Sequence, residues 1–208
     1  YDVDNIDELD AAAPAADVAV DFSAPASLPH TLAYARRTGA AVVSGTTGLS
    51  PEQLDELRAL GEKNRVIWAS NYSLGVAALR RATALVARTL AGWDVEIVET
   101  NHNQKVDAPS GTAKALLAAV DPTGERPVVG GREGIVGARV PGEIGMHAVR
   151  GGTVAGTHEV HFFGTDEEVC LTHRAASRQI FVAGAVSAAE RLLRRPVGFY
   201  DFDGLMFG

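Results

Sequence analysis

Residues 99–113 read ETNHNQKVDAPSGTA, and this stretch determines how the rest of the chain is interpreted. A β-rich run at residues 93–98 precedes it, and a helix is predicted to begin within its Ser-Gly-Thr end. Ser110 is well placed as the N-cap of that helix, because a serine oxygen there accepts a hydrogen bond from a first-turn amide. The stretch therefore predicts a strand, a short polar loop and a capped helix in succession.

The start of this helix is predicted to bind an anion. Helical geometry leaves the amides of Gly111, Thr112 and Ala113 without carbonyl partners, and the helix dipole adds positive potential at the same end. Ser-Gly-Thr alone is typical of an ordinary capped helix. Here the preceding loop also holds Lys105, a histidine, two asparagines and a glutamine. This combination favours a small molecule that carries a carboxylate.

Composition excludes several classes of function. The chain has 208 residues, 46% of them hydrophobic, and a formal net charge of -7, which argues against non-specific binding to nucleic acid or to an anionic membrane. No apolar run approaches the roughly 20 residues that a membrane span requires. Cys170 is the only cysteine, so no intrachain disulfide is possible and a cytoplasmic location is predicted. Its place in an alternating run predicts a buried structural thiol rather than a nucleophile.

The first third of the chain alternates strands with helices. A β-α-β-α-β order implies a parallel sheet with right-handed crossovers. Each strand ends in small polar residues, and open α/β sheets bind ligands at that edge. The predicted strands are 17–21, 40–44 and 65–69, and the predicted helices are about 28–37 and a second one opened by Ser50 and Pro51.

The rest of the chain predicts a second domain followed by a returning helix. The expected fold is α/β: a truncated Rossmann-type parallel-sheet domain of residues 1–73 and 178–208, and a substrate-binding and oligomerisation α+β domain with a mixed sheet at 74–177. Glycine-containing turns are expected to act as hairpins between the later strands. The elements are a helix at 74–90, a loop at 116–139, strands at 144–149, 154–163 and 168–173, hairpins at 151–152 and 164–166, a helix at 178–194 and a tail at 198–208.

Residues 99–113 resemble the signature E-x-H-H-x-x-K-x-D-A-P-S-G-T-A of dihydrodipicolinate reductases, with Asn101 in place of the first histidine. Shorter motifs extend the resemblance over nearly the whole chain. They are DFS at 21–23, GTTG at 45–48, ASNYSLGV at 69–76, IGMHAVRGG at 144–152 and THRAASR at 172–178.

The resemblance implies a nicotinamide-dependent reduction of 4-hydroxy-tetrahydrodipicolinate in lysine and diaminopimelate biosynthesis, by a homotetramer. It implies two catalytic positions, Lys105 and Asn101, the latter where the family has its acid/base histidine. Substrate binding is expected from His102, Ser110, Gly111, Thr112 and Arg178. Binding of NADH or NADPH is expected from Gly45, Thr46, Thr47, Ala69, Ser70, Asn71 and Tyr72.

Asn101 leaves a second interpretation open. An asparagine has no proton to give near neutral pH, so the chain could instead be a catalytically weak module that binds a dicarboxylate and oligomerises. The glycine-rich turn of a dinucleotide-binding domain is not seen, and the natural N-terminal portion is expected to be absent. No metal site is predicted, because His158 and His161 would face opposite sides of a strand.

Overall fold

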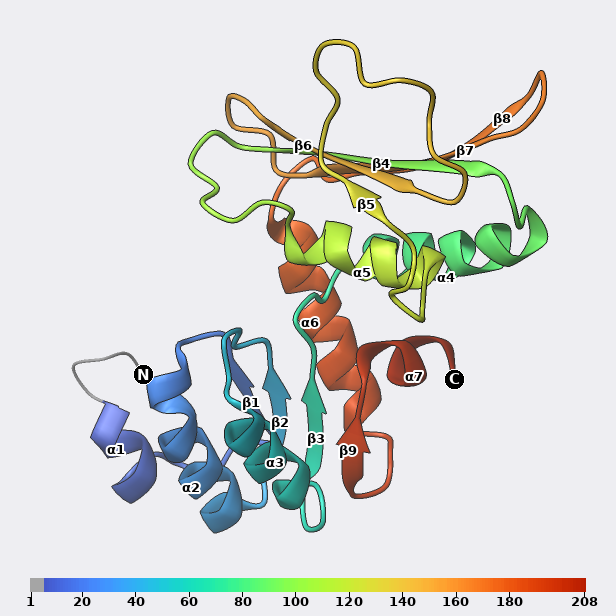
Figure 1. Cartoon of the computed structure of the whole chain (residues 1–208). Coiled ribbons are helices and arrows are strands. Elements are labelled where there is room, and N and C mark those ends of the chain that lie inside the picture. The colour runs from blue at the N-terminus through green and yellow to red at the C-terminus, as the bar shows by residue number, and fades with distance from the viewer. Residues whose placement is uncertain (1–5) are drawn as a thin grey trace. The chain divides into compact units, whose positions relative to one another are not determined.

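The computed structural model describes residues 6–208, which form two compact units. One unit holds the chain up to Leu74 together with Gln179–Gly208, and the other holds Gly75–Arg178. Each unit has its own β-sheet and its own hydrophobic core, and Figure 1 labels their elements. In the part of the chain that the structure describes, no helix is both long and apolar enough to span a bilayer.

The first unit is built on a four-stranded parallel sheet in the order β1-β2-β3-β9. Its strands are β1 (Val18–Asp21), β2 (Ala41–Ser44), β3 (Arg65–Trp68) and β9 (Gly198–Tyr200). The first three confirm the predicted β-α-β-α-β order. Strand β9 lies in the stretch that was expected to be a tail, because three residues are too short a run to show a period.

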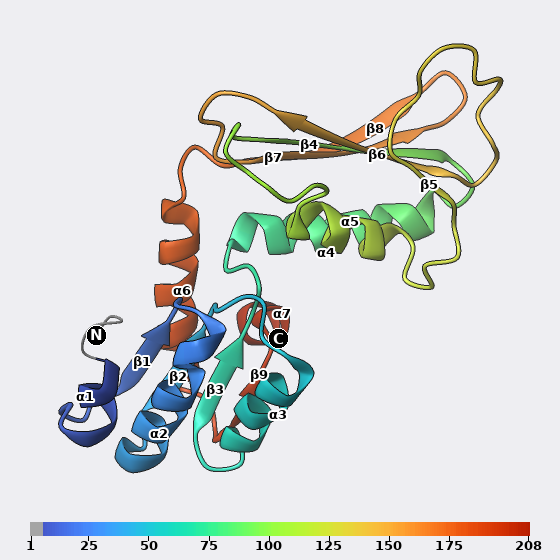
Figure 2. The same ribbon diagram turned by 60° about the vertical axis from the view of Figure 1, so that its left-hand side comes forward.

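Helices flank this sheet, as Figures 1 and 2 show for α2 and α3. Residue Ser50 caps α3 as predicted: its Oγ accepts from the amide of Gln53, whose side-chain Oε1 accepts from the amide of Ser50. The core beneath is apolar and includes Leu28, Leu32 and Val42. The helices of this unit are α1 (Ile6–Ala11), α2 (Leu28–Thr38), α3 (Pro51–Leu60), α6 (Gln179–Leu192) and α7 (Phe202–Phe207), with a short 3-10 turn at Pro25–Ser27.

The second unit contains a mixed five-stranded sheet in the order β5-β6-β4-β7-β8. Strand β4 pairs in parallel with β6 and antiparallel with β7, which confirms the predicted mixed sheet. Helices α4 (Leu74–Thr89) and α5 (Gly111–Val120) cover one face (Figures 1 and 2). The strands are β4 (Asp94–Asn101), β5 (Val128–Val129), β6 (Ile144–Arg150), β7 (Thr157–Phe163) and β8 (Glu168–Arg174).

One of the two predicted hairpins is wrong. Strands β6 and β7 were expected to pair through Gly151-Gly152, but β4 lies between them. A glycine turn marks where the chain changes direction and does not specify which strand becomes the neighbour. The hairpin at 164–166 is confirmed, since β7 and β8 pair antiparallel, and Asp166 there has a φ of 61°.

The prediction of a buried thiol is also wrong, because Cys170 is exposed. Side chains of a strand alternate between the two faces of a sheet. Val169 and Leu171 pack against the core that includes Phe162, so Cys170 between them points to the face opposite the helices. The alternating pattern was predicted correctly, but Cys170 was assigned to the buried face of the strand and lies on the exposed one.

Candidate active site

Strand β4 extends further into the signature than the sequence suggested. The predicted strand ended at Val98, whereas β4 continues to Asn101. Burial alternates along its whole length, and Glu99 and Asn101 occupy the same buried phase as Val95 and Ile97. Glu99 and Asn101 are polar residues at buried positions, so the apolar pattern in the sequence ends before the strand does. The side chains of Glu99 and Asn101 are thereby buried in the second unit, next to the loop of residues 102–110 that joins β4 to α5, the signature loop.

The helix after the loop begins as predicted. Ser110 is the N-cap of α5, and its Oγ accepts from the amide of Ala113 at 3.1 Å. That amide is therefore used by the cap. The amides of Gly111 and Thr112 lie in the first turn, where helical geometry supplies no carbonyl four residues earlier. Gly111 is exposed, so the helix start is open to a ligand.

Glu99 is a fully buried carboxylate at the base of the loop. Its Oε1 accepts from the amide of Ser110 at 3.0 Å and from Arg150 Nη2 at 2.8 Å, and its Oε2 accepts from Asn101 Nδ2 at 3.1 Å. Burial by itself raises the pKa of Glu99, but hydrogen bonds involving His158, Ser110 and Arg150 outweigh it and lower the pKa to about 2. The carboxylate is therefore ionised at neutral pH and fixes both ends of the loop.

Arg150 links the loop to Glu99. Its Nη2 donates to Glu99 Oε1 and, at 2.7 Å, to the backbone carbonyl of Asp107. It occupies the last position of β6, directly opposite Asn101 in the parallel register. Arg150 falls within a motif of the resembling family, but no role was predicted for it. Its role depends on the β4–β6 pairing, which no local pattern in the sequence indicates.

His158 is a second residue that the sequence analysis missed. It is 5% exposed, and its Nε2 lies 3.4 Å from Ser110 Oγ and 3.7 Å from Glu99 Oε2. Its Nδ1 is buried and has no hydrogen-bond partner among the described residues. His158, Val160 and Phe162 lie at every second position of β7 and therefore share its core face. This spacing was the signal in the sequence that could have identified His158 as buried. A histidine at a buried position of a strand is expected to contact other buried polar groups, because buried polar atoms need hydrogen-bond partners.

Asn101 is nine-tenths buried and is held by Glu99. The position that carries the acid/base histidine in the resembling family therefore holds an amide that supports the buried carboxylate. His102, one residue further, is only partly buried and lies outside the strand. The predicted roles of these two residues stay predictions.

Lys105 lies in the loop between β4 and α5. Its Nζ contacts Asp107 Oδ1 at 2.7 Å, and its side chain is 22% exposed while that of Asp107 is 51% exposed. The ammonium holds the pKa of Asp107 below its ordinary value. Because this pair is partly open to solvent, a ligand carboxylate can compete with Asp107 for the ammonium.

The acidity of Glu99 makes stability depend on pH. Since its folded pKa is about 2 and its ordinary value is 4.5, its contribution to the free energy of unfolding is fully present above the ordinary value and is lost as pH falls toward 2. Urea denaturation at pH values between 4.5 and 2 is expected to show that the free energy of unfolding falls more steeply with decreasing pH for the wild type than for Glu99→Gln. Equal slopes would contradict the lowered pKa of Glu99. If the variant does not fold, carbon-13 NMR titration of the wild type decides: a Glu99 midpoint near 4.5 would contradict it equally.

The predicted cofactor segments of the first unit meet at one edge of its sheet. Strands β1, β2 and β3 end side by side, and Thr46 joins two of these ends. Its Oγ1 lies 3.1 Å from Asp21 Oδ1, and its carbonyl accepts from Trp68 Nε1 at 3.0 Å. Gly45 allows the Phe22 ring to approach, because a Cβ there would lie 2.2 Å from it. The edge is thus built from small residues and backbone groups.

The individual cofactor candidates differ in exposure. Thr47 and Ser70 are exposed, and Asn71 is half-buried, with its Oδ1 accepting from the amide of Ser73 at 2.7 Å. Tyr72 is 1% exposed, and its hydroxyl donates to the carbonyl of Ser44 at 2.8 Å. Burial raises the pKa of Tyr72. Its side chain is therefore part of the core, and only its backbone is available for the predicted contact.

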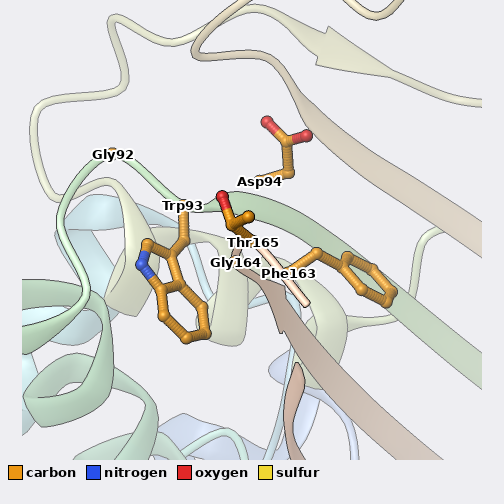
Figure 3. A pocket seen from close by; sticks show the side chains of 6 residues that line it. All are labelled: Gly92, Trp93, Asp94, Phe163, Gly164 and Thr165. Carbon is orange, nitrogen blue, oxygen red and sulfur yellow. The ribbon is translucent and has the colours of Figure 1, made fainter. Parts of the chain in front are cut away.

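Two further features are Arg178 and a surface hollow. Arg178, predicted to bind substrate, is exposed directly before α6. A surface hollow of about 280 Å³ is lined by Trp93, Asp94 and Phe163 and by Gly92, Gly164 and Thr165 (Figure 3). It lies at the start of β4, whereas the loop follows the end of that strand, about 23 Å away at the rise of an extended chain. The hollow therefore contains none of the predicted site residues.

Comparisons with known proteins agree on one family. Models described as "Dihydrodipicolinate reductase, N-terminus" and "Dihydrodipicolinate reductase, C-terminus" match residues 1–72 and 75–206. A 4-hydroxy-tetrahydrodipicolinate reductase of Staphylococcus aureus strain MRSA252 is 44% identical over 191 residues, covering 91% of this chain and 79% of the relative. One from Natronomonas pharaonis is 43% identical over 190 residues, covering 90% and 77%.

A solved structure agrees with these matches. A dipicolinate-bound dihydrodipicolinate reductase from Paenisporosarcina sp. TG-14 superposes with a TM-score of 0.73 at 27% identity, covering 92% of this chain and 74% of that one.

Proposed function

The chain belongs to the dihydrodipicolinate reductase family, and on that premise we propose that it reduces 4-hydroxy-tetrahydrodipicolinate with NADH or NADPH in lysine and diaminopimelate biosynthesis. The observation that carries this proposal is the loop between β4 and α5. It carries one ammonium, Lys105, and leads into a helix start that Ser110 caps, and a buried ionised Glu99 bonds the amide of Ser110. A cyclic dicarboxylate fits such a site.

The substrate carboxylate is clamped by the loop and the helix start. The amide of Gly111 donates to its oxygens at the exposed helix start that Ser110 and Thr112 complete, and Lys105 exchanges Asp107 for the incoming carboxylate. The helix dipole adds to the attraction. Arg150 fixes the loop by its bond to the carbonyl of Asp107, so little ordering of the loop is needed when the substrate binds.

The proton that completes the reduction comes from the loop or from water. Within the loop Lys105 is the donor, since it is the lysine between β4 and α5 and the family resemblance assigns it this role. His102 hydrogen-bonds to the substrate ring or to its carboxylate. Asn101 has no proton to give near neutral pH, so turnover depends on Lys105 or on water. Arg178 is an additional candidate contact to the substrate.

The edge of the parallel sheet in the first unit fits a nicotinamide. Thr47 and Ser70 are exposed there, whereas Ala69 is buried and the Phe22 ring fills the space beside Gly45, so these two residues offer only backbone groups. Asn71 lies at the same edge. When bound, the reduced nicotinamide would supply a hydride to a ring carbon, and the 4-hydroxyl group of the substrate would leave as water to give tetrahydrodipicolinate. The residues of this edge would orient the nicotinamide ring.

Assembly as a cytoplasmic homotetramer completes the proposal. The sheet face opposite α4 and α5 carries partly exposed apolar side chains, among them Val149 and Phe163, at 47% and 39% exposure. A face of this kind suits packing on another copy of the chain. Light scattering is expected to give four times the chain mass of 21.8 kDa, whereas a monomer at micromolar concentration would contradict it.

A coupled assay tests the reaction. The substrate is generated enzymatically, and oxidation of NADH or NADPH is followed by the absorbance of the reduced nicotinamide. We expect oxidation that depends on the substrate and is inhibited by dipicolinate. Binding of dipicolinate without turnover would support the alternative of a catalytically weak binding module, which the Asn101–Glu99 hydrogen bond favours. Failure to bind dipicolinate would contradict both.

A further inference from the structure

A cluster of metal-ligating side chains lies on the sheet face opposite α4 and α5, away from Glu99 and His158. It is formed by His161 on β7 and by Glu168 and Cys170 on β8. His161 and Cys170 are directly opposite each other in the antiparallel register. Glu168 lies two positions before Cys170 and points to the same face. The β7–β8 hairpin thus presents nitrogen, sulfur and oxygen donors together.

Within this His161–Glu168–Cys170 cluster, the two ring nitrogens of His161 face different partners, and only one of them can serve as a metal ligand. His161 Nδ1 lies 2.5 Å from Glu168 Oε1, and His161 Nε2 lies 3.8 Å from Cys170 Sγ. One ligand atom from each residue can be chosen so that all three lie within 4.8 Å of one another. Tetrahedral zinc with bonds of about 2.0 to 2.3 Å separates its ligand atoms by roughly 3.5 Å. Reaching that geometry requires rotation of the His161 ring or of the Glu168 side chain, so that one ring nitrogen, the carboxylate and the sulfur face the same point.

We propose that the His161–Glu168–Cys170 cluster binds a divalent transition-metal ion of the zinc class. A thiolate and an imidazole select zinc, cobalt or copper over magnesium and calcium, which prefer oxygen ligands. Binding forms a metal–sulfur bond, and the Cys170 thiol releases its proton to solvent as that bond forms. Three protein ligands leave a fourth tetrahedral position for water, or for a ligand atom from another copy of the chain where this sheet face packs in the proposed tetramer.

Neighbouring side chains support the site. The Phe163 ring stacks on the His161 imidazole, with centroids 5.7 Å apart and planes 7° apart, which restricts the orientation of the ligand. Thr172 Oγ1 lies 3.4 Å from Cys170 Sγ and can donate a hydrogen bond to a thiolate. Glu159 Oε2 lies 3.9 Å from His161 Nε2, and Arg174 pairs with the same carboxylate group at 3.0 Å. Glu159 is therefore placed as an outer group that favours a cation.

Cobalt titration of the full chain, in its assembled state and with its thiol reduced, tests the proposal. Co²⁺ is used as the probe because thiolate ligation produces a sulfur-to-cobalt charge-transfer absorption in the near ultraviolet, and tetrahedral coordination produces intense visible bands. We expect one Co²⁺ per chain with both signals, and displacement of the cobalt by Zn²⁺. Zn²⁺ is also expected to raise the Tm.

Three variants identify the ligands. Cys170→Ser is expected to abolish the charge-transfer band and to weaken Co²⁺ binding at least tenfold, and His161→Gln is expected to weaken binding similarly. His30→Gln, on α2 in the other unit, removes a histidine outside the cluster and is expected to bind as the wild type does. The Tm measured with chelator shows whether each variant folds. A cobalt spectrum without the charge-transfer band, or one that Cys170→Ser leaves unchanged, overturns the proposal.

Discussion

Replacing Lys105 by alanine is expected to lower kcat/KM for the reductase reaction by about 10²–10³-fold, because the substitution removes both a carboxylate contact and the proposed proton donor. Both losses destabilise the transition state, so kcat is expected to fall and KM to rise. Steady-state oxidation of NADH or NADPH over a range of substrate concentrations separates the two parameters. The fold is expected to persist, since the side chain makes its ion pair at the surface with Asp107.

Lys114→Ala is the matched control. Lys114 is exposed on α5, the same helix that Ser110 caps, and its removal changes the net charge by the same amount. A long-range electrostatic effect would be similar in the two variants, whereas a direct contact requires Lys105 alone. A Lys105→Ala enzyme with kcat/KM within threefold of the wild type would contradict the assignment.

Restoring histidine at position 101 is expected to raise kcat at least tenfold, because a positioned general acid contributes about 10²–10⁴-fold and the native asparagine contributes none. Glu99 is ionised at neutral pH and lies beside this side chain, so its charge would favour the protonated imidazole. The measurement is kcat for Asn101→His across pH.

The pH profile distinguishes catalysis from a packing effect. A new ionisation in kcat is expected for Asn101→His, with activity lost as the imidazole deprotonates at high pH. Asn103→His serves as the control, because Asn103 is exposed two residues further along the same loop. If kcat of Asn101→His matches that of the wild type, the acid does not act from this position, and Lys105 or water supplies the proton in both enzymes.

The sequence was sufficient for the class of fold and for the start of the helix that follows the loop. Strand ends such as Ser44 and caps such as Ser50 and Ser110 are local features, determined by residues close in the chain, and each was predicted correctly. The same holds for the hairpin turn at 164–166, where the strands on either side are neighbours.

The groups beneath the loop could not be predicted in the same way. Glu99 belongs to the site because β4 continues beyond its apolar run, and Arg150 belongs to it because β6 pairs with β4 across some fifty residues. His158 reaches Ser110 only because β7 lies on the other side of β4. These contacts depend on strand order, and a period of two residues carries no information about which strands become neighbours.

Calorimetric titration with dipicolinate tests the central claim, that Lys105 and the start of α5 hold a cyclic dicarboxylate. The wild type is expected to bind one dipicolinate per chain. Lys105→Ala and Ser110→Ala are each expected to bind it at least tenfold more weakly, with Lys114→Ala unchanged. Equal affinity in all four proteins would place the dicarboxylate elsewhere and contradict the account.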